Sequence, residues 1–149
     1  MPKAVFDSAT LVSAFLTPEG LSAILLRQAV GGVFSLALCE DIIAETERTL
    51  TIYRRIRRRY PYTDDEIAAF GQMLRGTFPP LSDLPQLAGV CRDPKDDVII
   101  ACALKARARF LVTRDDDLLS LGTYRRIQMI APEAFSELLR ARRRRRPRS

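Results

Sequence analysis

The sequence contains no histidine, and its three cysteines, Cys39, Cys91 and Cys102, show no CxxC spacing. These absences argue against a zinc site and leave no histidine to act as a general base or in a catalytic triad. Three unpaired thiols suit the reducing cytoplasm, where they pack as small apolar residues. No apolar run approaches the ~20 residues of a membrane span, and the N-terminus lacks a signal-peptide pattern. We therefore expect a soluble, cytoplasmic protein with no membrane segment.

The formal charge of +6 is unevenly distributed along the 149 residues. The last ten residues, RARRRRRPRS, include seven arginines and no acid, which leaves 17 basic against 18 acidic residues elsewhere. The expectation is one domain over residues 1–139, followed by a basic, disordered tail over 140–149.

Short apolar runs alternate with helix-like segments. Strands are expected at 4–6, 34–38, 110–113 and 127–131. Helices are expected at 21–30, 41–59, 63–76, 95–107 and 118–121, and after Pro132. Thr63 and Glu66 have capping-box spacing, and three prolines mark 77–90 as an extended crossing. This alternation predicts an α/β fold with a central parallel sheet and helices on both faces.

Acidic residues lie at the ends of these apolar runs. Asp7 follows the first strand, and Glu45 shares a helix face with isoleucines. Asp96 and Asp97 stand at the start of an apolar helix, and Asp115 to Asp117 follow the strand at 110–113. The ends of parallel strands meet at one crevice, so these acids should converge. Like charges ~4 Å apart repel by about 4 kcal/mol per pair at an effective dielectric of 20, and a divalent cation removes that penalty. Oxygen ligands favour Mg²⁺ or Mn²⁺, which indicates a metal-dependent phosphodiesterase.

Each acid also has an ordinary structural explanation. Asp7 could bond its own turn, and Glu45 could reach solvent from the edge of the core. Asp93 or Asp96 could cap the following helix, and one aspartate of the 115–117 run could cap the next helical turn. Only the joint pattern favours a metal site.

Four segments carry a resemblance to a known family: VFDSATLVSAFL (5–16), LCEDIIAETERTL (38–50), CRDPKDDVIIACALKARARFLVTRDDDLLSLG (91–122) and QMIAPEAF (128–135). Together they resemble the PIN-domain family over residues 4–139, most closely its bacterial and archaeal toxins of toxin–antitoxin systems. The resemblance implies a three-layer α/β/α sandwich with a central parallel sheet, and Mg²⁺- or Mn²⁺-dependent cleavage of single-stranded RNA. It also implies a cognate antitoxin protein as partner and a homodimer.

The resemblance assigns roles by position. Its catalytic acids fall on Asp7, Glu45, Asp97, Asp115 and Asp117, of which Asp7, Asp97 and Asp115 would bind metal. Glu45 would orient the attacking water or bind metal through water. The supporting residues are Ser8 and Thr113.

The chain departs from the family pattern at two positions. Ala9 stands where the family usually has asparagine, and Cys39 stands where it has serine. Without the amide at position 9 we expect a lower catalytic rate. Residues that hold metal ligands in place typically change activity or affinity about 10- to 100-fold.

An arginine run is the expected RNA contact: Arg54, Arg55, Arg57, Arg58 and Arg59. Arginines bind phosphates without reading sequence, and the tail would act likewise. A solvated, solubilising surface is the alternative for both runs.

Two other functions remain open at this point. One is a catalytically weak PIN-like domain that binds RNA or a protein. The other is a phosphohydrolase with an aspartyl nucleophile, which would need an Asp-x-Asp pair where this chain has Asp7-Ser8-Ala9.

Overall fold

Five short strands form one sheet in the order β2-β1-β3-β5-β4. They are β1 (Lys3–Phe6), β2 (Ser35–Ala37), β3 (Phe110–Val112), β4 (Thr123–Tyr124) and β5 (Ile127–Ile130). The structure, a computed structural model, describes residues 1–145. β1 pairs in parallel with β2 and β3, and β3 pairs in parallel with β5, whereas β4 is antiparallel to β5. Parallel strands need long crossovers, and helices supply them here.

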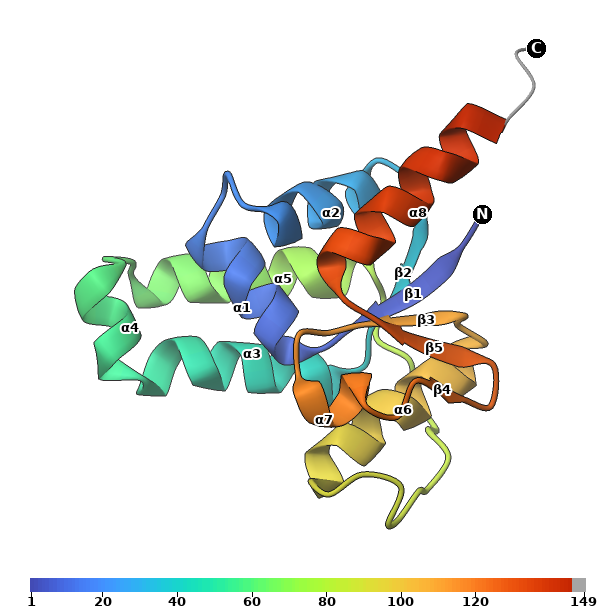
Figure 1. Ribbon diagram of the computed structural model, residues 1–149. Coiled ribbons are helices and arrows are strands. Elements are labelled where there is room, and N and C mark those ends of the chain that lie inside the picture. Colours follow the sequence, from blue (N-terminus) through green and yellow to red (C-terminus); the bar gives the residue numbers. More distant parts are fainter. Residues whose placement is uncertain (146–149) are drawn as a thin grey trace.

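The helices cover both faces of this sheet (Figure 1). They are α1 (Ser8–Leu16), α2 (Leu21–Val30), α3 (Glu40–Ile52), α4 (Arg54–Arg59), α5 (Asp64–Thr77), α6 (Pro94–Ala106), α7 (Asp116–Leu119) and α8 (Pro132–Arg145). In Figure 1, α2 and α8 lie above the sheet and α6 lies below it, while α3 and α5 extend to one side as an arm with α4 at its tip. The predicted α/β/α sandwich with a central parallel sheet is confirmed.

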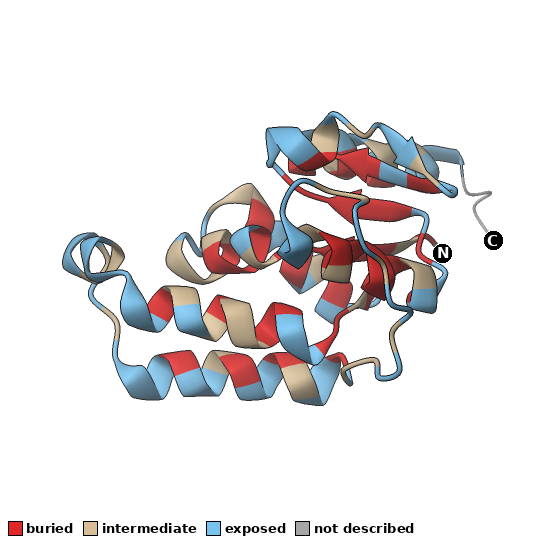
Figure 2. Ribbon diagram, turned by 90° about the horizontal axis from the view of Figure 1, so that it is seen from below, coloured by how far each residue is buried: buried red, intermediate tan, exposed pale blue. Residues whose placement is uncertain are grey.

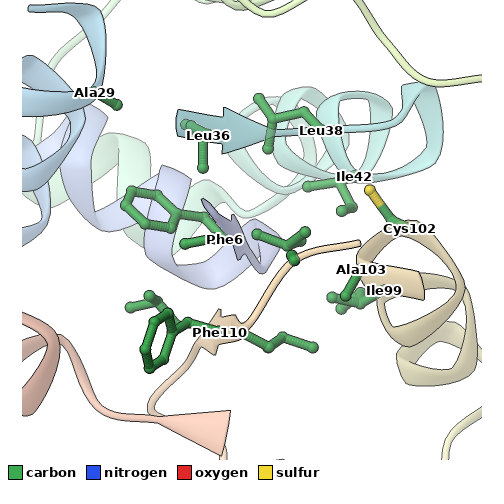
Figure 3. Close-up of a cluster of buried hydrophobic side chains, with 14 of the residues drawn as sticks. Phe6, Ala29, Leu36, Leu38, Ile42, Ile99, Cys102, Ala103 and Phe110 are labelled. Carbon is green, nitrogen blue, oxygen red and sulfur yellow. The ribbon is translucent and has the colours of Figure 1, made fainter. Parts of the chain in front are cut away.

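The core lies on both faces of β1 and β3, whose apolar side chains are fully or almost fully buried (Figure 2). Phe6 and Phe110 pack on the α2 and α8 side through a chain of aromatic contacts with Phe34 and Phe135. On the other face, Ile99, Cys102 and Ala103 of α6 pack near Leu38 and Ile42 (Figure 3). Because both faces are covered, the strands are continuously apolar, as parallel strands usually are.

Most predicted elements are present, and the differences have physical reasons. Residues 8–16, where no helix was expected, form α1, because the Asp7 side chain caps the helix by accepting from the amide of Thr10. The segment expected as one helix over 41–59 breaks at Tyr53, whose ψ of 94° is extended. β4 was not expected because two residues give no periodic signal. The capping box of Thr63 and Glu66 is present as predicted.

The expected disordered tail is partly wrong. Helix α8 continues through Arg145, so residues 140–145 are helical instead of disordered. Arginine is a good helix former, and four arginines in the last turn of α8 suit the negative end of the helix dipole. Residues 146–149 lie outside the described residues.

Within residues 1–145, no single helix is long and apolar enough to cross a membrane; α1 and α2 reach that length only together, across a bend of 101°.

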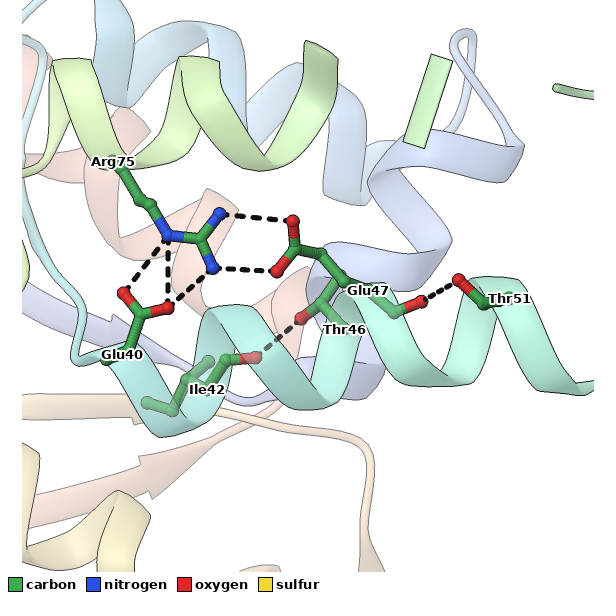
Figure 4. Close-up of polar contacts among 6 residues, drawn as sticks. All are labelled: Glu40, Ile42, Thr46, Glu47, Thr51 and Arg75. Atoms are coloured by element: carbon green, nitrogen blue, oxygen red, sulfur yellow. Dashed lines mark hydrogen bonds and ion pairs between the residues drawn. The ribbon is translucent and has the colours of Figure 1, made fainter. Parts of the chain in front are cut away.

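One arginine joins the two long helices of the arm (Figure 4). Arg75 of α5 contacts both carboxylates of α3 that face it, Glu40 at 2.6 Å and Glu47 at 2.7 Å. The absence of a side chain at Gly71 makes room, since a Cβ there would lie 2.2 Å from the Glu47 carboxylate. The bidentate pairs also lower the pKa of Glu40 below its ordinary value through hydrogen bonding to Arg75.

Replacing Arg75 should loosen the arm. Arg75→Ala leaves two carboxylates facing each other, and we expect it to lower the free energy of unfolding by about 1–2 kcal/mol in urea titrations. Arg140→Ala is the matched control, because the Arg140–Glu137 pair is 4.0 Å long and exposed; its effect should be within about 0.5 kcal/mol of zero. Equal stability of the two variants would show that the Arg75 contacts contribute nothing.

Candidate active site

Asp7 is the most firmly held acid at the carboxyl edge of the sheet. It follows β1, is 4% exposed, and caps α1. Its Oδ1 accepts hydrogen bonds from the amide of Thr10 at 2.9 Å and from Thr10 Oγ1 at 2.6 Å. Its Oδ2 accepts from Thr113 Oγ1 at 2.6 Å. Two threonines from different elements therefore fix the orientation of this carboxylate.

Thr113 links the ends of β1 and β3. It is fully buried directly after β3, donates to Asp7, and accepts from the amide of Asp115 at 3.0 Å. Asp115 in turn caps α7 by accepting from the amide of Asp117 at 2.8 Å. The predicted supporting role of Thr113 thus has a geometric basis, and Asp7, Asp115 and Asp117 lie at one edge. Asp115 and Asp117 are both exposed.

Asp96 of α6 lies close enough to these acids for their charges to act on its carboxyl. Burial and the negative charges of Asp115, Asp93, Asp7 and Asp117 raise the pKa of Asp96 to about 6. The causes that raise this pKa show that the carboxyl of Asp96 lies within the field of the other site acids. Asp93 is the N-cap of α6, bonded to the amide of Lys95.

Asp97 is occupied elsewhere. It is 4% exposed, accepts a 2.7 Å hydrogen bond from the amide of Cys91, and lines a different hollow with the crossing segment at 84–88. Burial, then the hydrogen bond to Asp97, raises the pKa of Cys91 to about 12, so this thiol stays neutral. One oxygen of the Asp97 carboxylate therefore anchors the loop before α6, and the metal-binding role predicted for Asp97 stays a prediction.

Glu45 lines a cavity of about 450 Å³ between α3 and α6, together with Ser8 and Asp96. Two cations of the same cavity pair with it: Arg48 Nη1 at 2.7 Å and Lys95 Nζ at 3.5 Å. The cavity brings Glu45 and Ser8 beside Asp96, whereas the other predicted acids, Asp7, Asp97, Asp115 and Asp117, do not line it. Glu45 is already partly neutralised by the two cations, which the sequence pattern did not indicate.

The acids are suitable ligands for a hard divalent cation, but they do not form a preorganised coordination site. Within residues 1–145, no group of three acidic or sulfur side chains is placed so that it could hold a metal ion. The donors are all carboxylate oxygens, which Mg²⁺ and Mn²⁺ prefer. Burial, and then the negative charges of neighbouring aspartates, raise the pKa of Asp96, and a cation would offset those charges. Asp117 is exposed, and Asp115 is exposed with only Oδ1 engaged as the cap of α7, so the residues present fit such an ion after side-chain movement.

The predicted RNA-binding arginines are not part of this cavity. Arg54 to Arg59 form α4 at the far tip of the arm, where no residue is buried (Figure 1). Arg57 is already engaged, with an ion pair to Asp64 and its guanidinium 5.2 Å from the centre of the Tyr62 ring. Arg48 and Lys95 are the basic side chains that line the cavity itself.

The sequence analysis did not single out Thr10, and it named Asp96 only as a neighbour of Asp97. Thr10 could have been found, because Asp-x-x-Thr is the spacing at which an N-cap carboxylate meets the third helical residue. Asp96 could not be separated from Asp97, because neighbouring helical residues point about 100° apart and the direction depends on where the helix begins. Ala9, expected at the crevice mouth, is exposed on α1 and does not line the cavity.

A parallel α/β/α sandwich with buried and exposed carboxylates at the carboxyl edge of its sheet places those acids where ligands of such folds bind. The family model described as PIN domain matches residues 3–117, and the chain belongs to that family. PIN domains are generally nucleases, that is, hydrolases. A comparison with curated proteins finds no match.

Proposed function

We propose that this protein is a Mg²⁺- or Mn²⁺-dependent endoribonuclease that cleaves single-stranded RNA. The observation that carries the proposal is the hydrogen-bonded chain from Asp7 through Thr113 to the amide of Asp115 at the carboxyl edge of the sheet. The raised pKa of Asp96, caused by burial and then by Asp115, Asp93, Asp7 and Asp117, supports it. Five acids from three segments act on one another at one edge without a protein cation among those causes. Such an arrangement destabilises the protein unless a cation binds there.

In this proposal, the acids at the sheet edge bind the cation. Asp7, held by Thr10 and Thr113, and Asp96 and Asp115 would hold the cation. Asp117 adds negative charge beside them. A bound divalent ion would supply charge neutralisation of the phosphate and activation of water.

Glu45, Arg48 and Lys95 would contact the attacking water and the RNA. Glu45 faces the cavity and can accept a proton or a hydrogen bond from the attacking water. Arg48 and Lys95, now paired with Glu45, can transfer to a phosphate that enters the cavity. The two cations would thereby release Glu45 when RNA binds.

The same ion pairs support a second candidate, a catalytically weak PIN domain that binds RNA or a protein. Arg48 and Lys95 neutralise Glu45, and Ala9 offers no amide to the acids. In that case the cavity would accept phosphates without cleaving them.

Cleavage of a labelled single-stranded RNA with and without Mn²⁺ separates the two candidates. The enzyme should cut RNA with Mn²⁺ and lose all cleavage in EDTA. It should also gain thermal stability with Mn²⁺, because binding at 100 times Kd contributes about 2.7 kcal/mol. RNA binding with neither cleavage nor a Mn²⁺-dependent shift in Tm would favour the non-catalytic domain.

We also propose that the protein is the toxin of a toxin–antitoxin pair, that it pairs with an antitoxin protein, and that it forms a homodimer. The support is the sequence resemblance over residues 4–139 to toxins of this kind. Expression in a bacterial host should arrest growth, and Asp7→Asn should remove the arrest. Light scattering measures the oligomer.

The arginines of α4 are proposed to contact RNA phosphates outside the cavity. Replacing Arg54, Arg55 and Arg58 by Gln removes three exposed charges and leaves the Arg57–Asp64 pair intact. Each lost phosphate contact should lower the slope of log affinity against log salt by about 0.7. We expect a fall of up to about 2, measured by fluorescence anisotropy in EDTA. An unchanged slope would identify α4 as a solvated surface.

A further inference from the structure

Basic side chains gather at the sheet edge opposite the acids. Arg109 immediately precedes β3, Arg126 immediately precedes β5, and Arg107 ends α6. The amide of Arg109 donates to the carbonyl of Lys3 at 3.0 Å, and the amide of Gln128 donates to the carbonyl of Arg109 at 2.8 Å. Because β1, β3 and β5 are parallel, the residues before them meet at the edge remote from Asp7 and Asp115.

Four exposed arginines surround a hollow of about 380 Å³ at this edge. We call them the arginine edge: Arg107, Arg109, Arg125 and Arg126. The floor between them is apolar, formed by Ala103, Leu104, Ala108 and Ile127. Within the part of the chain that the structure describes, none of the four forms an ion pair. The charges are therefore available to a ligand.

Three of these arginines occupy backbone conformations that do not suit arginine. The φ angles are +56° at Arg107, +43° at Arg125 and +71° at Arg126. Arg125 and Arg126 are the two-residue loop between β4 and β5, and positive φ at both positions is the mark of a type I′ turn, which favours Asn-Gly. Arg107 ends α6 in the left-handed conformation that favours glycine. Glycine or asparagine would stabilise the fold better than arginine at these three positions. Backbone strain of this kind is typical of functional sites.

We propose that the arginine edge binds the phosphates of a single-stranded RNA segment that flanks the cleaved bond, an inference that rests on the proposed ribonuclease function. Guanidinium groups pair with phosphate through two parallel hydrogen bonds. The guanidinium of Arg125 lies 5.3 Å from the centre of the Tyr124 ring, and a stacked guanidinium plane of this kind also accepts an RNA base. An acidic protein segment would use the charges but not this stacking surface.

The position of the arginine edge sets the class of RNA. From residue 109 to residue 113 the chain follows β3 for about 13 Å, so the arginine edge and the acids are at least that far apart through the sheet. A strand of RNA that contacts both must extend well beyond the cleaved bond. The preferred substrates are therefore longer RNAs, and short oligonucleotides can occupy only the acidic site.

The test uses a double variant that removes charge without harming the fold. Arg125→Asn with Arg126→Gly installs the preferred type I′ sequence, so Tm should rise by about 3 °C. Affinity for a single-stranded RNA of about 30 nucleotides should nevertheless fall about 10-fold in EDTA, and its salt slope should fall by about 1.4. Arg27→Gln is the single-charge control, because Arg27 lies on α2 and bonds the carbonyl of Pro18; its slope should stay within about 0.3 of wild type.

Binding in EDTA tests the proposal even if no cleavage is found. With Mn²⁺, the double variant should show a raised KM and an unchanged kcat on the long RNA, and no change on an oligomer of about 5 nucleotides. Unchanged RNA affinity in the stabilised double variant would overturn the proposal. So would an equal loss per charge in Arg27→Gln. Tighter binding of an oligoglutamate peptide than of RNA, lost in the double variant, would overturn it in favour of an acidic protein partner.

Discussion

Asp7→Asn should lower the rate of metal-dependent RNA cleavage at least about 100-fold while the protein stays folded. Asparagine keeps the shape of the side chain and can still accept the hydrogen bonds that Thr10 donates to Oδ1. It removes the charge of a buried acid, 4% exposed, that three hydrogen bonds hold in place. A cation held by carboxylates loses affinity when one of them becomes neutral. Cleavage is measured with Mn²⁺, and metal binding by calorimetry.

Thr113→Val is the matched control for the support of Asp7. It removes the 2.6 Å hydrogen bond to Oδ2 and the acceptor for the amide of Asp115 but leaves every charge in place. We expect a loss of cleavage of about 10- to 100-fold with metal binding retained at higher Mn²⁺. If Asp7→Asn retained full cleavage per folded molecule, Asp7 would be only a helix cap and the proposed site would be wrong.

The sheet and its acidic edge were predictable because the signals are local. Apolar runs followed directly by Asp7 and by Thr113 to Asp117 place those residues at strand ends whichever helices connect them. The capping box at Thr63 and the glycines after α2 mark helix ends in the same direct way. The family match over residues 3–117 covers the same acids.

The features that the sequence did not predict depend on how the helices and turns are oriented in three dimensions. Whether Asp96 or Asp97 faces the site is decided by the rotation of α6, which its contacts with β1 and β2 set. The pairing of Glu45 with Arg48 and Lys95 needs α3 and α6 side by side, which no pattern in either helix encodes. The positive φ values of Arg125 and Arg126 contradict local preference, so the sequence predicted neither β4 nor its turn.

Asp96→Asn and Asp97→Ala should have opposite effects, and this contrast tests which of the two acids of α6 serves the site. Asp97→Ala leaves the amide of Cys91 without its 2.7 Å acceptor and should lower the free energy of unfolding by about 1–3 kcal/mol. Cleavage per folded molecule should be retained to within about 3-fold, because the carboxylate of Asp97 serves the loop before α6. Asp96→Asn should lose cleavage by at least about 100-fold and gain stability in EDTA.

The stability that Asp96→Asn gains in EDTA should depend on pH. Because the folded protein raises the pKa of Asp96 to about 6, the native carboxyl keeps its proton between about pH 4 and pH 6, where the unfolded one has lost it. The free energy of unfolding in EDTA should therefore fall as the pH rises through this window, and Asp96→Asn should flatten that fall. Above pH 6 the variant should be the more stable protein until Mn²⁺ is added, which should stabilise the wild type and much less the variant. If Asp97→Ala lost cleavage while Asp96→Asn kept both cleavage and the pH-dependent fall in stability, Asp97 would be the site acid after all.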